Sequence, residues 1–286
     1  DDYLTKPVHP AELQARIRSL LTRSQTRASV SAPNVPRGYV VGVLGAKGGV
    51  GTSSLALNLA VGFQKTNKGT SLAVEMKPGQ GTWALELGLE KIEGLSNLLH
   101  LRPSEINHSM VEKYVTKTTF GVNLLLASNS LKDIELCAAS AQMDALIQTL
   151  PYTAQFIVLD IGTGIQPGVD NILSICNELI LLTEPAPSSV QRARILLTEL
   201  EETGFGKTKP LTVVIYNRFR SDLQLSNQQI HEALSVSTSV IIPPSPEQAY
   251  QAALRYLPLT LAKQDGTVTQ QYNLLTDQVM HRVNHP

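Results

Sequence analysis

Residues 40–60 read VVGVLGAKGGVGTSSLALNLA, and this stretch decides the fold. A short apolar run suited to a buried strand precedes a glycine-rich loop, and a segment with helical spacing of apolar residues follows it. Glycines let the backbone take positive φ angles and come close to a ligand, while the first N–H groups of a helix favour an anion. The stretch therefore predicts a phosphate-binding loop. A glycine-rich turn without a ligand is the alternative, which the flanking strand and helix disfavour.

The rest of the chain alternates short apolar runs with helical segments. Such alternation is typical of a mostly parallel sheet with helices on both faces, so we expect a doubly wound α/β fold. Strands are predicted at residues 39–44, 71–75, 122–126, 156–160, 179–183, 211–216 and 239–242. Helices are predicted at residues 53–64, 133–150, 168–176, 188–203, 227–234, 246–255 and 267–283, with short ones near 85, 95–98 and 111–115.

Composition narrows the possible functions and compartments. The chain has 286 residues, 42% of them hydrophobic, and its 24 Lys and Arg residues balance 24 Asp and Glu residues. Zero net charge argues against general electrostatic binding of DNA. Two cysteines cannot build a disulfide framework, which favours the cytoplasm. The apolar runs are far shorter than the ~20 residues of a membrane-spanning helix, and no secretory signal pattern opens the chain.

The N-terminal residues differ in pattern from the rest. Residues 1–24 open with Asp-Asp-Tyr-Leu-Thr-Lys-Pro and continue as an amphipathic helix, whereas residues 25–37 are rich in Ser, Ala, Arg and Pro and are expected to form a linker. We therefore predict three units: 1–24, 25–37 and 38–286. Because the first residue is Asp and not Met, we expect a fragment of a longer chain.

The glycine loop departs from an ordinary Walker A sequence. On the pattern G-x-x-x-x-G-K-[ST], Thr52 stands where the lysine belongs, and Lys47 stands early. The run Lys-Gly-Gly-Val-Gly resembles the deviant Walker motif of the MinD/ParA family of ATPases. The resemblance implies that ATP binds on the loop and that Lys47 reaches a partner subunit's nucleotide. The nucleotide-binding residues that it implies here are Gly48, Gly49, Val50, Gly51, Thr52, Ser53 and Ser54.

The resemblance covers nearly all of residues 38–265. It implies that Ser53 ligates Mg²⁺ and that Asp160, which ends the apolar run 156–160, is the Walker B acid in the outer shell of the metal. Asn217 and Arg218 resemble an Asn-Arg pair whose asparagine contacts adenine, and Pro243 lies in a segment like the family's Ile-Pro loop beside the base. Each match is weak alone, but their order and spacing are specific.

Within the family, Lys-Gly-Gly-Val-Gly-Thr-Ser looks most like the CpaE/TadZ branch, in which a receiver-like domain precedes a MinD-like ATPase. The opening of the chain resembles the end of a response-regulator receiver domain, with Lys6 matching the receiver's lysine; an ordinary N-terminal helix is the alternative. This likeness implies a nucleotide-dependent homodimer that serves as a positional scaffold for pilus or secretion assembly proteins. It is expected in the cytoplasm, with recruitment to the inner face of the membrane or to a cell pole.

Two departures from the family bear on catalysis. Thr52 removes a charge-assisted hydrogen bond of roughly 1.5–3 kcal/mol, which weakens ATP binding by about ten- to a hundredfold. Where the family has Asp-x-Asp after the second strand, this chain has Glu75-Met76-Lys77, so the charge is reversed at the water-positioning site. The predicted catalytic residues are Lys47, Glu75 and Asp160, but hydrolysis is expected to be slow or absent.

The same two departures suggest a hypothesis about charge. Lys77 could restore near the phosphates the positive charge that Thr52 removes. The alternative is a solvated loop lysine beside Pro78 and Gly79.

Two other functions stay open. A pseudo-ATPase would be a response-regulator output module that acts only through protein–protein interaction. A ParA-like DNA-partitioning ATPase would need a basic dimer surface, which the neutral composition disfavours.

Several other residues are expected to be structural. Cys137 and Cys176 are expected to be buried thiols, not ligands of an iron–sulfur cluster. Trp83 is expected in the core, with an apolar interaction surface as the alternative. Residues 268–283 are amphipathic, but their polar face offers Arg282 and little other positive charge, so we expect packing on the domain and no direct membrane binding.

Overall fold

The computed structural model describes residues 36–66, 68–90, 93–165, 168–217, 224–236 and 238–285. The predicted receiver remnant with Lys6, nearly all of the predicted linker, and Arg218 lie outside these ranges.

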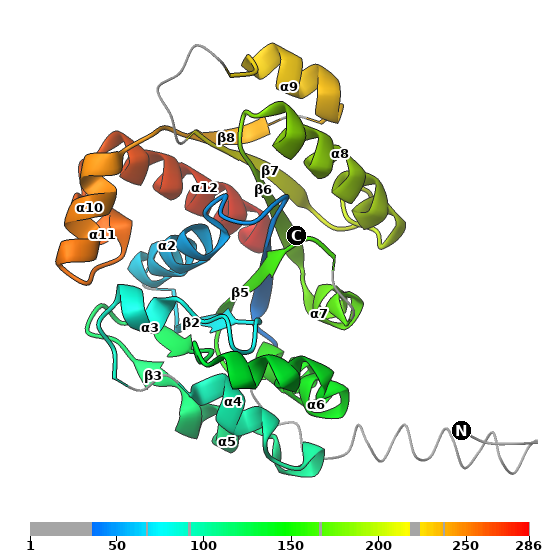
Figure 1. The fold of residues 1–286 in the computed structure, drawn as a ribbon, viewed down its shortest axis with the longest axis vertical. Helices are drawn as coiled ribbons and strands as arrows, with labels where there is room; N and C mark the ends of the chain where they lie inside the picture. Colours follow the sequence, from blue (N-terminus) through cyan, green and yellow to red (C-terminus); the bar gives the residue numbers. More distant parts are fainter. Residues whose placement is uncertain are drawn as a thin grey trace, which may run out of the picture. The chain divides into compact units, whose positions relative to one another are not determined.

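The described residues form an eight-stranded sheet in the order β3-β4-β2-β5-β1-β6-β7-β8 (Figure 1). Strand β1 (Tyr39–Gly45) lies between β5 (Phe156–Thr163) and β6 (Glu178–Thr183), parallel to both. These three strands are buried along most of their length, because helices cover both faces of the sheet. The remaining strands are β2 (Ser71–Glu75), β3 (Thr116–Lys117), β4 (Asn123–Leu125), β7 (Leu211–Tyr216) and β8 (Thr238–Ile242).

All seven predicted strands are present, and the predicted mostly parallel α/β fold is confirmed. The short strand β3 was not predicted; it pairs antiparallel with β4 at the edge of the sheet.

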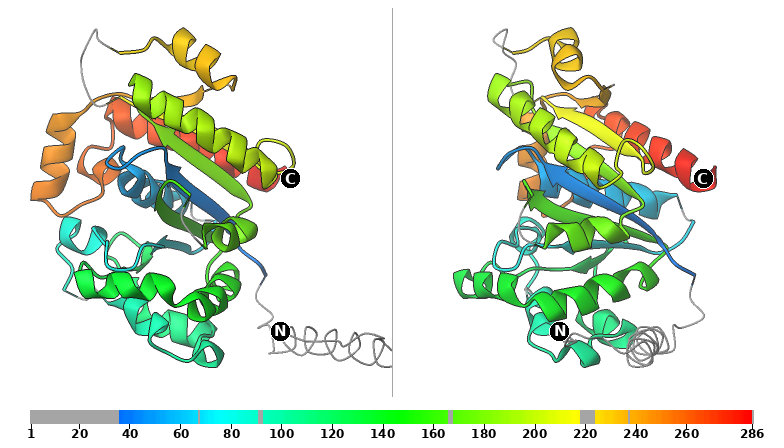
Figure 2. Two further views of the ribbon diagram at one scale, coloured as in Figure 1. Left: turned by 45° about the vertical axis from the view of Figure 1, so that its right-hand side comes forward. Right: turned by 90° about the vertical axis from the view of Figure 1, so that its right-hand side faces the viewer.

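Helices lie on both sides of the sheet (Figure 2). One side carries α4 (Gly94–Leu99), α5 (His108–Tyr114), α6 (Ser140–Thr149), α7 (Val169–Ile175), α8 (Pro187–Glu202) and α9 (Asn227–Leu234). The other side carries α2 (Thr52–Lys65), α3 (Trp83–Glu86), α10 (Pro246–Leu254), α11 (Leu259–Ala262) and α12 (Thr267–Asn284).

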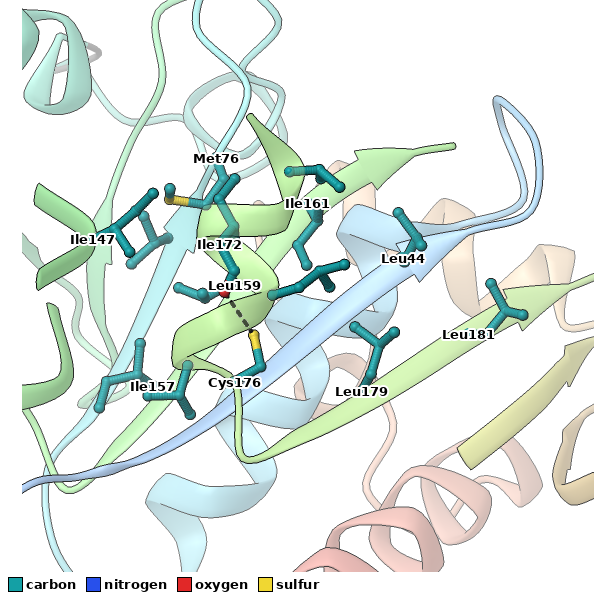
Figure 3. Close-up of a cluster of buried hydrophobic side chains, with 14 of the residues drawn as sticks. Leu44, Met76, Ile147, Ile157, Leu159, Ile161, Ile172, Cys176, Leu179 and Leu181 are labelled. Atoms are coloured by element: carbon teal, nitrogen blue, oxygen red, sulfur yellow. Dashed lines mark hydrogen bonds between the residues drawn. The ribbon is translucent and has the colours of Figure 1, made fainter. Parts of the chain in front are cut away.

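Figure 3 shows the core on the first side, where side chains from β1, β5 and β6 meet those of α7. Cys176 lies here, and its Sγ donates a hydrogen bond to the carbonyl of Ile172 at 3.3 Å. Trp83 is fully buried on the other side, as expected. The core fixes the central strands, and thereby the loops that follow their carboxyl ends.

The predicted helix 133–150 is wrong in its first half. A 3-10 helix, Leu131–Ala138, precedes α6, and Ala139 interrupts them with a non-helical ψ of 58°. The reason is tertiary: the Asp133 carboxylate accepts hydrogen bonds from the hydroxyls of Ser96 and Ser128, both at 2.5 Å. This segment lies on the surface, so Cys137 is exposed and the prediction of a buried thiol is wrong for it.

Helix α12 packs against the domain, as predicted. Its apolar face is buried at Val268, Tyr272, Leu275 and Val279. Among the described residues, no helix combines the length and the apolar character that a membrane crossing requires.

Candidate functional site

The glycine loop lies between the end of β1 and the start of α2. Gly49 and Gly51 have φ angles of 77° and 100°, in the left-handed region that glycine tolerates. Gly45 must also be glycine, because a Cβ there would lie 2.3 Å from Oγ1 of Thr52. Helix α2 has no side-chain cap and no acidic residue in its first turn, so its N-terminal amides are available to an anion.

A cavity of about 460 Å³ opens over this loop. Its walls come from the carboxyl ends of neighbouring parallel strands, which is where open α/β sheets bind ligands. Gly48 faces open space, since a Cβ built on it would meet no atom within 4 Å. The residues that line the cavity include Gly48, Gly49, Gly51–Ser54, Met76–Pro78, Cys137 and Ile161–Thr163.

Lys77 lies in this cavity between the two residues predicted to hold a metal. Its Nζ donates a hydrogen bond to Oγ of Ser53 at 2.6 Å and pairs with Oδ2 of Asp160 at 2.7 Å. The Lys77 side chain is 13% exposed and that of Asp160 is fully buried, so Lys77 is not a solvated loop lysine. The other carboxylate oxygen of Asp160 accepts from the N–H of Gly162 at 3.1 Å.

The donor atoms of Ser53 and Asp160 are oxygens, as Mg²⁺ prefers. In this arrangement the Lys77 ammonium bridges both, so Mg²⁺ could reach these oxygens only after the ammonium had left. Among the described residues, there is no group of three or more His, Cys, Asp or Glu side chains that could hold a metal ion.

Lys47 also has a carboxylate partner within its own chain. Its ammonium pairs with Glu184, which follows β6 and which sequence reasoning did not identify. The Lys47 side chain is 43% exposed and that of Glu184 is 10% exposed. The pair thus joins the glycine loop to the next strand-to-helix junction.

The carboxylate of Glu75 shapes the wall of the cavity. Its Oε1 accepts from the N–H groups of Thr82 and Trp83, at 2.7 and 3.2 Å, and its Oε2 accepts from that of Ala127 at 3.0 Å. Burial raises the pKa of Glu75. Both carboxylate oxygens are engaged by backbone, which gives Glu75 a structural role; its catalytic role stays a prediction.

The residues predicted to border adenine lie at the ends of β7 and β8. The N–H of Asn217 donates to the carbonyl of Ile242 at 2.8 Å, which joins the two strand ends next to Pro243. Oδ1 of Asn217 is buried and has no hydrogen-bond partner in the described part of the chain, so it is available to a ligand donor. Neither Asn217 nor Pro243 lines the 460 Å³ cavity. The cavity and the ends of β7 and β8 are close to each other at Gly51. This residue lines the cavity, and a Cβ built on it would lie 3.7 Å from the ring of Tyr216, the last residue of β7.

Comparisons with known proteins agree with this geometry. Residues 38–210 match the family model described as AAA domain. The septum site-determining protein MinD of Synechocystis sp. is 28% identical over 194 residues, which cover 67% of this chain and 68% of that protein. The MinD of Thermotoga maritima is 24% identical over 235 residues, 78% of this chain and 82% of that protein.

Solved structures show the same fold. A ParA family ATPase from Chlorobium tepidum superposes with a TM-score of 0.73 at 20% identity, over 83% of this chain and 98% of its own. The MinD of Pyrococcus horikoshii, solved in complex with Mg-ADP, gives a TM-score of 0.71 at 20% identity, over 85% of this chain and 96% of its own.

Proposed function

The chain belongs to the AAA-domain family of P-loop ATPases related to MinD and ParA, and from this premise we propose that it is an ATP-binding protein that dimerises when nucleotide fills its glycine loop. The observation that carries the proposal is the loop itself. Its glycines and the N-terminal amides of α2 face a cavity of about 460 Å³ at the carboxyl end of the sheet. An adenine nucleotide is the ligand that the relatives favour, because the Pyrococcus horikoshii protein was solved with Mg-ADP.

In this proposal the main chain holds the phosphates. The N–H groups of residues 48–54 cradle the phosphate oxygens, and Asn217, Arg218 and Pro243 border the base. Thr52 contributes no positive charge, so the cavity's ammonium comes from Lys77. Ser53 and, in the outer shell, Asp160 are the residues that would hold Mg²⁺ if the Lys77 ammonium left them, and the metal would then neutralise phosphate charge.

Dimerisation would be driven by Lys47. Its ammonium would leave Glu184 and pair with the phosphates of the partner subunit's nucleotide, a stronger and more highly charged acceptor. Hydrolysis is expected to be slow or absent, because Lys77 stands at the sequence position where the related ATPases have an acid that orients the attacking water. Its ammonium is instead paired with Asp160.

The nucleotide-bound dimer would then act as a positional scaffold. The CpaE/TadZ-like loop sequence supports pilus or secretion assembly proteins as partners of the dimer. These partners would recruit the dimer to a cell pole or to the inner face of the membrane. The Aquifex aeolicus relative was solved as a MinC:MinD complex, which is a precedent in the family for a protein partner. Zero net charge disfavours DNA as a partner.

Calorimetric titration with ATP and with ADP tests the proposal. Gly48 offers a matched pair of variants, because a side chain there meets no atom within 4 Å and requires no positive φ. Gly48→Gln adds bulk to the cavity without charge, and Gly48→Glu adds the same bulk with a carboxylate, so Gly48→Glu should weaken binding much more than Gly48→Gln does by charge repulsion with the phosphates. A wild-type chain that binds neither nucleotide would contradict the proposal and would favour the pseudo-ATPase module.

A further inference from the structure

The ammonium of Lys77 occupies the point at which two predicted metal ligands converge. Ser53 Oγ comes from the first turn of α2 and Asp160 Oδ2 from β5, and they lie 2.6 and 2.7 Å from Nζ. The first contact is a hydrogen bond and the second is an ion pair. Mg²⁺ would need Ser53 Oγ at about 2.0–2.1 Å, with Asp160 in its outer shell, so the ammonium lies where the metal would bind. One position therefore serves either the ammonium or the metal.

The backbone on both sides of this contact is held firmly. Next to Lys77, the N–H of Met76 donates to the carbonyl of Asp160 at 2.9 Å, and the carbonyl of Lys77 accepts from Gln80 at 3.1 Å. Next to Ser53, its carbonyl accepts from Nε1 of Trp83 at 3.1 Å. Lys77 thus reaches Ser53 and Asp160 from a fixed turn.

The Lys77 ammonium faces several carboxylates, since Glu75 and Glu86 lie near it as well as Asp160. Asp160 is fully buried and forms an ion pair with Lys77. An unpaired buried charge is costly, and for Asp160 the chain supplies the opposite charge itself. The hypothesis that Lys77 replaces the Walker lysine stays a prediction, and its contacts with Ser53 and Asp160 point to a second role at the metal position.

We propose that Lys77 takes the place of the divalent cation, so that the chain binds its nucleotide without Mg²⁺. The inference rests on the proposed nucleotide-binding function and concerns the same cavity. A bound triphosphate would then contact the Lys77 ammonium, which is already held by Asp160 and Ser53. No metal ion would have to bind from solution.

The test compares ATP binding in Mg²⁺ with ATP binding in excess EDTA, by calorimetry. For the wild-type chain, the dissociation constant should change by less than about threefold, below the 1.4 kcal/mol that corresponds to a factor of ten. Lys77→Met frees Ser53 and Asp160 for a metal, and its ATP affinity should fall by about tenfold or more when EDTA removes Mg²⁺. Lys207→Met, at a lysine that is 62% exposed, is the control and should behave as wild type.

Electron paramagnetic resonance of Mn²⁺ gives a second readout that does not depend on turnover. The wild-type chain with ATP should hold Mn²⁺ no more tightly than free ATP does, whereas Lys77→Met with ATP should hold it more tightly. A wild-type affinity for ATP that drops tenfold or more in EDTA overturns the inference and leaves the proposed function intact. Failure to bind ATP under both conditions overturns both, and the wild-type comparison decides the matter even if Lys77→Met does not fold.

Discussion

Lys47 and Glu184 form an ion pair that ties the glycine loop to the end of β6 within a single chain. The lysine proposed to act on a partner subunit is therefore held by its own subunit before nucleotide binds. Because Lys47 is 43% exposed, this pair is partly screened by solvent and easily broken. In the proposed function, exchange of this carboxylate for a partner's phosphate would link dimerisation to nucleotide binding.

Removal of the carboxylate should favour the nucleotide-bound dimer. Glu184→Gln loses a partly exposed pair of about 0.2–1 kcal/mol in each subunit, or about 0.4–2 kcal/mol for the dimer. The dimer should therefore form at up to about thirtyfold lower protein concentration in ATP. Lys47→Ala should abolish the nucleotide-dependent gain in dimer. Sedimentation velocity with and without ATP measures both. Equal dimerisation of Lys47→Ala and wild type would contradict the role given to Lys47.

Restoring the Walker lysine should strengthen nucleotide binding. Thr52 lines the cavity, and its Oγ1 is buried without a hydrogen-bond partner in the described part of the chain, so its loss costs no hydrogen bond there. Thr52→Lys adds a charge-assisted hydrogen bond to phosphate and should tighten ATP binding by about ten- to a hundredfold. Thr52→Met, of similar length but neutral, is the control for calorimetry. If Lys and Met give the same affinity, the phosphates do not lie beside residue 52.

The two cysteines should react at very different rates. Cys137 is exposed and lines the cavity, whereas Cys176 is buried, and burial raises its pKa to about 12. A thiol reagent at pH 8 should therefore modify Cys137 quickly and Cys176 only after unfolding. Saturating ATP should slow the fast phase, because nucleotide covers the cavity. Mass spectrometry identifies the modified residue, and Cys137→Ala should lack the fast phase. A rate at Cys137 that ATP leaves unchanged would place the nucleotide elsewhere.

Helix α12 should behave as part of the folded domain. The guanidinium of Arg282 pairs with Glu178, which is fully buried in β6, and its Nε lies 3.0 Å from Oε2. Arg282→Ala leaves this carboxylate without its cation and should lower the free energy of unfolding by about 3 kcal/mol, as measured by urea denaturation. Arg282→Lys should restore part of it. A loss below about 0.5 kcal/mol, the size of an ordinary surface substitution, would mean that α12 is only loosely attached.

The sequence predicted the sheet and the loop well because both depend on local pattern. Buried parallel strands are continuous apolar runs, and the strand–glycine loop–helix order fits within 21 residues. The contact of Asp133 with Ser96 could not be predicted, because the two residues are 37 positions apart in the sequence. Nothing in the sequence indicated that the helix is interrupted at Ala139, so Cys137 was predicted to lie in a helix and to be buried.

The ion pairs of the site join segments that are far apart in sequence. Lys77 meets Asp160, and Lys47 meets Glu184, across separate strands of the sheet. A lysine next to Pro78 and Gly79 is typical of a solvated turn, and the signal against that interpretation was the coincident loss of lysine at Thr52. The backbone amides around Glu75 gave no signal in the sequence. The amide of Ala127 reaches it because β2 lies beside β4, and those of Thr82 and Trp83 reach it because the segment after β2 folds back.

A crystal structure of the chain grown with excess ATP and Mg²⁺ tests the central claim most directly. The account predicts phosphate density over the amides of residues 48–54, with the Lys77 ammonium still between Ser53 and Asp160. A loop closed against the triphosphate, with the nucleotide absent or bound elsewhere, would contradict it.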